Sequence, residues 1–262
     1  MISQLESIAS RAPKLELIIK DSLYLEIGLK IKINALGLIG KSLRNIKNGY
    51  TYFGVLLPDE ENNNEIDFST IDFSNNIINM NDNQILTGRQ FRIRFDINNN
   101  CYFIKDCSYG RGYGSFVKII NEMKIKDNTL INIGENYVVF TFGNSDSEIS
   151  DNNNNIENEK ILSVQIFSGE KNNYYYGFNQ REIKKILIGT NENCNIVLND
   201  NFLDDVHCNI EYKRGIGWVI NDGYQNKKSE RGTWLCLREE TKIFEGMIIQ
   251  SNQNIYECHI SK

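Results

Sequence analysis

Short runs in which apolar and polar residues alternate constrain the fold of this chain most strongly. In each run the apolar side chains occupy every second position, so they line one face of a half-buried strand. The clearest runs cover residues 25–33, 91–95, 162–166 and 256–260. Helices need a period near 3.6 residues, which these runs lack. The sequence therefore predicts an all-β protein.

A polar stretch divides the chain near its middle. Residues 143–159 carry almost no apolar side chains, so they cannot offset the entropy cost of ordering and are expected to form a linker. The 262 residues are 40% hydrophobic, enough for two small cores. A weak amphipathic pattern through Leu5, Ile8 and Leu15 suggests a short helix in the N-terminal segment. The expected organisation is an N-terminal segment at 1–20, a first domain at 21–143, a linker at 144–159 and a second domain at 160–262.

Charge and hydropathy exclude several classes of partner. The 29 Lys and Arg residues are outnumbered by 34 Asp and Glu residues, giving a net charge of −5, whereas nucleic-acid binding needs clustered cations. No apolar run approaches the ~20 residues that cross a bilayer, and no secretory signal pattern is present. We expect a soluble intracellular protein of the cytoplasm or nucleus, with an organelle left open, that binds neither nucleic acid nor membranes.

The cysteines and histidines do not form a metal-binding pattern. Six cysteines are present without a C-x-x-C pair, and His207 and His259 are the two histidines. Zinc sites use closely spaced Cys and His ligands, so we predict neither a metal site nor another cofactor. Four cysteines fall in strand-like runs, where a free thiol behaves as a small buried hydrophobe. These are Cys101, Cys208, Cys236 and Cys258.

The two halves of the chain repeat the same features in the same order. Residues 78–82 read I-N-M-N-D and residues 196–200 read I-V-L-N-D. Each stretch follows a strand that ends in glycine, and each precedes a bulky strand and then a strand that runs into aspartate. Both series close on glycine plus a hydroxyl residue, Gly114-Ser115 and Gly232-Thr233. Such order at similar spacing indicates a duplicated domain.

Residues 185–235 resemble a forkhead-associated (FHA) domain. The resemblance rests on the I-V-L-N-D stretch, His207, Asp222, Ser229 and the Gly232-Thr233 closure. It extends over 160–262, and over 20–143 it depends on the repeat. It implies two eleven-stranded β-sandwich domains in tandem, whose loops at one end bind phosphothreonine peptides. The family holds the phosphate with an Arg after the first Gly and with the Ser of S-R-x-H, orders the peptide with the Asn of N-G-T, and orders the loops with the His.

The second domain departs from the family at each contact position. Thr190 stands at the Arg position, Asp204 and Asp205 stand at the Ser-Arg pair, and Arg231 stands at the Asn position. Two carboxylates at contact distance would each repel a phosphate by ~1 to 4 kcal/mol at high to intermediate dielectric. We therefore predict that this pocket no longer captures phosphothreonine.

The first domain is altered at the same positions. They are occupied by Val55 for Arg, Thr87 and Gly88 for Ser-Arg, Gln90 for His, and Tyr113 for Asn. Thr87 keeps a hydroxyl, and Arg89, Arg92 or Arg111 is able to supply a positive charge. An altered anion site in this domain therefore remains as an alternative.

His207 and a cluster of tyrosines each have a structural and a functional interpretation. His207 is interpreted as a structural residue together with Gly189, Gly232 and Thr233, because no Ser, Cys or carboxylate pattern of catalytic type accompanies it. Tyr174, Tyr175 and Tyr176 form either ordinary surface aromatics or a contact patch.

The sequence favours a binding protein over an enzyme. The first hypothesis is a scaffold or assembly subunit that holds other proteins through two FHA-like domains with largely lost phosphothreonine pockets. The alternative is a phosphopeptide-binding signalling adaptor that uses the first domain or a rearranged pocket. A regulatory fragment of an enzyme is the third hypothesis, although these residues include no catalytic domain.

Overall fold

The computed structural model describes residues 2–44, 46–55, 65–70, 88–108, 114–144, 160–168 and 172–261. In the first half of the chain, helix α1 (Ile2–Ile8) precedes strands β1 (Lys14–Ser22), β2 (Lys30–Asn34), β3 (Gly37–Leu38), β4 (Tyr50–Val55), β5 (Phe68–Ser69), β6 (Gly88–Asp96), β7 (Cys101–Asp106), β8 (Ser115–Lys118), β9 (Met123–Lys124), β10 (Thr129–Ile133) and β11 (Asn136–Asn144). The second half contains β12 (Lys160–Ser168), β13 (Asn172–Phe178), β14 (Lys185–Gly189), β15 (Ile196–Val197), β16 (Cys208–Lys213), β17 (Gly217–Asp222), β18 (Trp234–Cys236), β19 (Thr241–Lys242), β20 (Ile248–Ser251) and β21 (Asn254–Ser261). The prediction of an all-β protein is confirmed.

One predicted strand is shorter than its alternating pattern. Within residues 25–33 only the part in β2 is extended, and Ile27 is 64% exposed. The reason lies at Ser22, whose Oγ accepts hydrogen bonds from the backbone N–H groups of Tyr24 and Leu25 and so ends β1 in a turn. The expected N-terminal helix is limited to α1, and Leu15 lies in β1 instead.

Contacts within the chain define two compact units. Unit 1 comprises Met1–Val117 and Leu237–Lys262, and unit 2 comprises Lys118–Cys236. This division differs from the expected domains at 21–143 and 160–262. Residues 145–159 of the expected linker lie outside the described residues.

Unit 1 consists of two sheets. One contains the strand order β3-β2-β1-β21-β20-β8, and the other has the order β5-β4-β6-β7-β19. Neighbouring strands are antiparallel except β4 and β5, which are parallel. Leu15, Leu17 and Ile19 of β1 alternate with more exposed residues and are fully buried, as expected of a sheet with one face on the core.

Unit 2 repeats this arrangement, except that β3 of unit 1 has no counterpart. One sheet contains the order β13-β12-β11-β10-β18, and the other has the order β15-β14-β16-β17-β9. The short parallel pair recurs as β14 and β15. The two units therefore share one topology, in which β14 corresponds to β4, β16 to β6 and β17 to β7.

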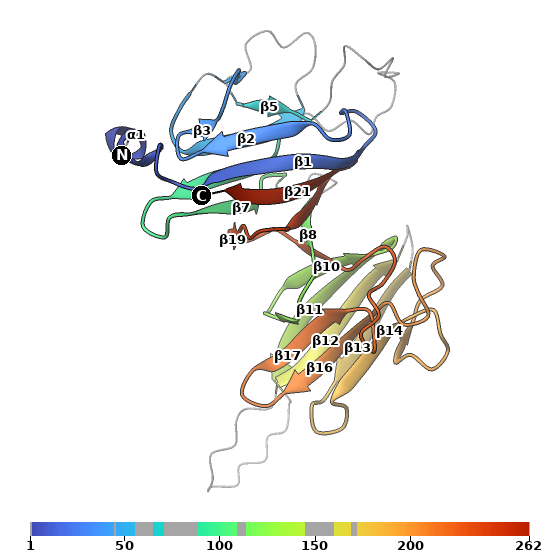
Figure 1. Ribbon diagram of the computed structural model, residues 1–262. Helices are drawn as coiled ribbons and strands as arrows, with labels where there is room; N and C mark the ends of the chain where they lie inside the picture. The colour runs from blue at the N-terminus through green and yellow to red at the C-terminus, as the bar shows by residue number, and fades with distance from the viewer. Residues whose placement is uncertain are drawn as a thin grey trace, which may run out of the picture. The chain divides into compact units, whose positions relative to one another are not determined.

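Each unit is completed by strands from the other half of the sequence. β1 pairs with β21, from Lys14↔Ser261 to Ser22↔Asn254, and the two strands lie side by side in Figure 1. In unit 2, β12 pairs with β11 from the first half, from Lys160↔Asn144 to Ser168↔Asn136. The first half thus supplies β9, β10 and β11 to unit 2, and the second half supplies β19, β20 and β21 to unit 1.

The supplied strands contribute to both cores. In unit 1 the rings of Phe53 and Phe91 stack with centroids 4.4 Å apart, and Tyr256 of β21 packs edge-on to Phe91 at 5.7 Å. In unit 2 the core joins Ile186, Ile188 and Ile210 to residues from the first half. Those residues are Ile119, Ile125, Ile131, Ile133, Val138 and Phe140. Full burial of a side chain of this size stabilises a fold by about 1.5–3 kcal/mol, so each unit depends on its supplied strands.

Candidate functional site

The end of strand β14 lies against the backbone of the 204–205 loop. A Cβ on Gly189 would overlap the carbonyl oxygen of Asp205 and would lie 2.9 Å from that of Asp204. The backbone N–H of Thr190 donates to the Asp204 carbonyl at 3.2 Å, and that of Asn191 donates to the Asp205 carbonyl at 3.1 Å. Glycine is needed here because no side chain fits between the two backbones.

His207 connects two loops from inside the domain. Its side chain is fully buried, its Nδ1 lies 3.4 Å from the backbone N of Asp204, and its Nε2 lies 3.0 Å from the carbonyl oxygen of Gly232. A carbonyl accepts only, so Nε2 carries the proton and Nδ1 accepts from the Asp204 N–H. The ring spans the 204–207 loop and the 229–232 loop.

A buried carboxylate orders the loop that closes on Thr233. Asp222 Oδ1 accepts from the hydroxyl groups of Ser229 at 2.5 Å and Thr233 at 2.9 Å. Ser229 Oγ in turn accepts from the N–H of Gly232, which has a φ of +83°. Burial, together with the nearby Asp222 carboxylate, raises the pKa of the Cys208 thiol, so this cysteine stays protonated. Gly232 and Thr233 are thus held by hydrogen bonds inside the domain.

The residues at the positions where the family holds the phosphate do not form a cluster of cationic donors. The carboxylate of Asp204 accepts from the N–H of Glu230 at 3.1 Å, and Asp205 is exposed. The guanidinium carbon of Arg231 lies 4.4 Å from the centre of the Phe202 ring, a cation–π stack. Asp204 therefore fixes the loop, and Arg231 covers an aromatic ring.

A hollow of about 500 Å³ opens beside these loops. Its lining includes three carboxylates, those of Asp204, Asp205 and Glu230, and one ammonium group, that of Lys227. Leu203, Val206 and Tyr224 complete the lining. The structure thus brings together Asp204 and Asp205 in one hollow, while Thr190 and Arg231 are outside the lining. An excess of negative charge repels a phosphate group.

Unit 1 keeps the backbone arrangement of this site. A Cβ on Gly54 would overlap the carbonyl oxygen of Gly88, which repeats the contact between Gly189 and Asp205. Gln90 stands at the position of His207, and its Oε1 accepts from the hydroxyl of Thr70 at 3.0 Å. Val55, at the Arg position, is fully buried in the core.

Arg89 is a cation of β6 that directly follows Gly88. Its Nε donates to the carbonyl oxygen of Glu65 at 2.9 Å, and its guanidinium carbon lies 4.1 Å from the centre of the Tyr52 ring. Thr87 and Tyr113, together with Arg111, lie outside the described residues.

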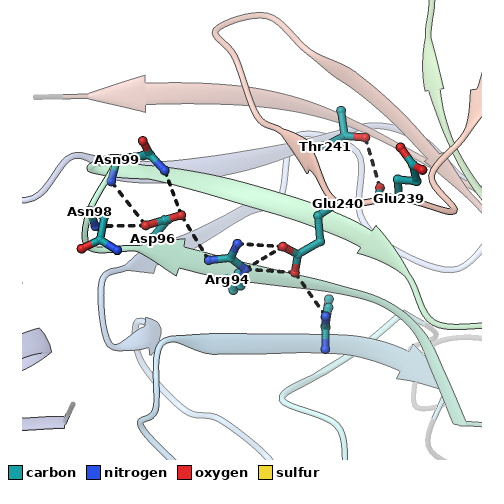
Figure 2. A network of polar contacts seen from close by, with 8 residues as sticks. Arg94, Asp96, Asn98, Asn99, Glu239, Glu240 and Thr241 are labelled. Carbon is teal, nitrogen blue, oxygen red and sulfur yellow. Dashed lines mark hydrogen bonds and ion pairs between the residues drawn. The ribbon is translucent and has the colours of Figure 1, made fainter. Parts of the chain in front are cut away.

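Sequence reasoning missed one ion-pair network in unit 1. Glu240 accepts from Arg94 at 2.7 Å and from Arg92 at 3.2 Å, and Arg94 also lies 3.5 Å from Asp96 (Figure 2). The hydrogen bonds from Arg94 lower the pKa of Glu240. The alternation of Arg92 and Arg94 with apolar residues placed both on one face, but their partner lies far away in the sequence.

Comparison with known families agrees with the resemblance found in the sequence. The sequence model of the FHA domain matches residues 186–255. A search among curated proteins found no significant match. The all-β fold is consistent with a sandwich of the FHA type, and FHA domains are modules that bind other proteins, typically through phosphothreonine peptides. In the described part of the chain, no helix is long and apolar enough to span a membrane.

Proposed function

We propose that the chain is an interaction scaffold built from two FHA-type sandwiches, and that unit 2 holds its protein partners without reading a phosphothreonine. The observation that carries this proposal is the charge of the hollow in unit 2. Asp204, Asp205 and Glu230 outnumber Lys227 there. Phosphothreonine brings a charge of about −1.5 to −2 and needs cationic and hydroxyl donors, whereas here a single ammonium group faces three carboxylates.

The proposal is tested with the full chain and a library of phosphothreonine peptides, each measured beside its unphosphorylated form. We expect equal binding of the two forms, at whatever level each peptide binds. Micromolar binding that requires the phosphate would contradict the scaffold proposal.

A charge-restoring variant provides the matched comparison. Thr190→Arg combined with Asp204→Ser and Asp205→Arg places cations and a hydroxyl at the family's contact positions. The serine keeps an acceptor for the Glu230 N–H. We expect this variant to gain phosphate-dependent binding while the circular dichroism spectrum stays unchanged.

The second candidate is a phosphopeptide adaptor that uses unit 1, and it is favoured by Arg89. This cation lies on Tyr52, next to the Gly54–Gly88 contact that repeats the loop arrangement of unit 2. If the unmodified chain binds phosphopeptides, Arg89→Ala should abolish the phosphate dependence. An unaffected Arg89→Ala variant would exclude this adaptor role.

A further inference from the structure

The exchange of strands between the halves is reciprocal and begins at the same point of the repeat. In each half a glycine and a hydroxyl residue, Gly114-Ser115 or Gly232-Thr233, lead into a strand of the same unit, β8 or β18. Beyond that strand the chain enters the other unit. Val117 and Lys118 mark the first boundary, and Cys236 and Leu237 mark the second.

Hydrogen bonds inside each unit fix both boundaries. In unit 1 the N–H of Leu237 donates to the carbonyl oxygen of Ser115 at 2.9 Å, and the N–H of Asp106 donates to the carbonyl oxygen of Leu237 at 2.8 Å. In unit 2 the N–H of Ile119 donates to the carbonyl oxygen of Thr233 at 2.8 Å. Residues of both halves therefore share backbone hydrogen bonds where the supplied segments begin.

A carboxylate just before each short supplied strand pairs with a cation of the receiving half. Glu240 precedes β19 and pairs with Arg94 of β6 (Figure 2). Glu122 precedes β9 and lies 2.5 Å from Nζ of Lys213 in β16. The two ion pairs occupy corresponding places in the two units, since β6 and β16 correspond.

The family match crosses the boundary between the units. Of the matched residues 186–255, those up to Cys236 belong to unit 2 and those from Leu237 belong to unit 1. The stretch that carries the family sequence is therefore not the stretch that forms one compact unit.

We propose that the two halves of the sequence are obligate partners of each other, each supplying to the other, within one chain, the strands that complete its sandwich. The same strand types would satisfy a tandem of self-contained domains, with β1 beside β11 and β12 beside β21. In the exchanged arrangement, residues of β1 contact residues of the second half. In the tandem arrangement, they would contact residues of the first half. Two lysine–carboxylate ion pairs distinguish the two arrangements without any mutation.

Carbodiimide coupling of the native chain tests the proposal, because it joins a lysine only to a carboxylate in direct contact. Lys20 and Glu257 lie 3.0 Å apart in unit 1, and Glu122 and Lys213 lie 2.5 Å apart in unit 2. Both pairs join the first half to the second. We expect peptide mapping by mass spectrometry to find both links in a product with the mass of one chain.

A protease site introduced between residues 145 and 159 adds a second readout. After coupling, cleavage and denaturation, the two fragments should remain covalently joined. In Glu122→Gln combined with Glu257→Gln, the joined fraction should fall to that of the uncoupled protein. Before coupling, the cleaved native chain should elute as one particle and separate only in denaturant.

The matched internal control is Lys30 with Glu16, which lie 3.0 Å apart within the first half and stay neighbours in either arrangement. Finding this link without the Lys20–Glu257 and Glu122–Lys213 links would overturn the proposal, as would separation of the cleaved fragments without denaturant. Links found in a product with twice the chain mass would overturn the exchange within one chain.

Discussion

Glu240 accepts hydrogen bonds from Nε and Nη2 of Arg94 at 2.7 to 3.0 Å, although 146 positions separate the two residues. This two-pronged geometry is the strong form of a carboxylate–guanidinium contact. The ion pair connects the segment that precedes β19 to β6, the middle strand of the β4-β6-β7 sheet. The side chains of Arg94 and Glu240 are 24% and 29% exposed, and because of the two-pronged geometry the pair is expected to matter more than an isolated surface ion pair.

Glu240→Gln should lower the free energy of unfolding by about 1 kcal/mol, since the amide keeps the shape but loses the charge-assisted bonds to Arg94 and Arg92. Urea titration of the full chain measures the change. Glu192→Gln, at an exposed loop position, is the matched control and should leave the unfolding midpoint in place. Equal midpoints for both variants would mean that the network contributes nothing to stability.

The same pair makes stability depend on pH in a defined direction. The hydrogen bonds from Arg94 hold the pKa of Glu240 below its usual value, so the folded state favours the ionised form. The stabilisation is present above the pKa of an unfolded Glu, near 4.3, and is lost as the pH falls through the folded value. The stability difference between the unmodified chain and Glu240→Gln should therefore shrink as the pH falls below about 4. A constant difference would contradict this assignment.

His259 should titrate above the usual pKa of histidine. Its Nδ1 lies 2.8 Å from a Glu245 oxygen and its Nε2 lies 3.4 Å from a Glu257 oxygen, and these contacts, that with Glu245 first, raise the pKa of the ring. The resulting stabilisation is complete below the unfolded pKa and is lost as the pH rises through the folded one. The chain has two histidines, so proton NMR resolves this titration readily. Glu245→Gln should move the midpoint of His259 downward, and an unchanged midpoint would exclude the pairing.

His207→Ala should lower the free energy of unfolding by about 1–3 kcal/mol, because the ring is fully buried and hydrogen-bonded to two loops. His259→Ala, measured above the pKa of His259 where its ion pairs no longer contribute, removes a partly exposed ring and provides the comparison. Partner binding should fall only as far as folding does. Full stability with abolished binding would instead make His207 a contact residue.

Gly189→Ala and Gly54→Ala should both destabilise the chain, by about 1–3 kcal/mol each, because the added methyl group meets backbone that has to shift. Gly143→Ala is the matched control, since a Cβ there meets no atom within 4 Å and the residue also lies in a strand. Thermal unfolding of the three variants compares them directly. Similar melting temperatures for all three variants would show that the loops shift to accept the methyl group without loss of stability.

The sequence predicts the strands and their buried faces, because alternation reports which side chains face a core. It also marks Gly189 as a structural residue through its place in the repeat, although not the loop that this glycine contacts. The exchange of strands could not be predicted in this way, since β11 and β21 are equivalent partners for β1 by pattern alone. The turn after Ser22 was missed for a related reason: Leu25 and Ile27 continue the alternation, but a local hydroxyl ends the strand.

The acidic hollow shows both the reach and the limit of residue-by-residue comparison. The replacement of Ser-Arg by Asp204 and Asp205 predicts a loss of positive charge. It does not predict that Asp204 serves the loop itself through the Glu230 N–H, or that Arg231 lies on Phe202. Those contacts form between loops, and the alternation of apolar and polar residues gives no information about how loops fold.

The pairing of β1 with β21 has a consequence for synthesis on the ribosome. β1 is synthesised before its partner β21, which follows only after about 230 further residues. At about 5–20 residues per second, the edge of β1 waits on the order of ten seconds or more for its partner. An open strand edge invites pairing with other chains. Since β2 pairs with the opposite edge of β1, the edge that receives β21 stays exposed to such pairing during that interval.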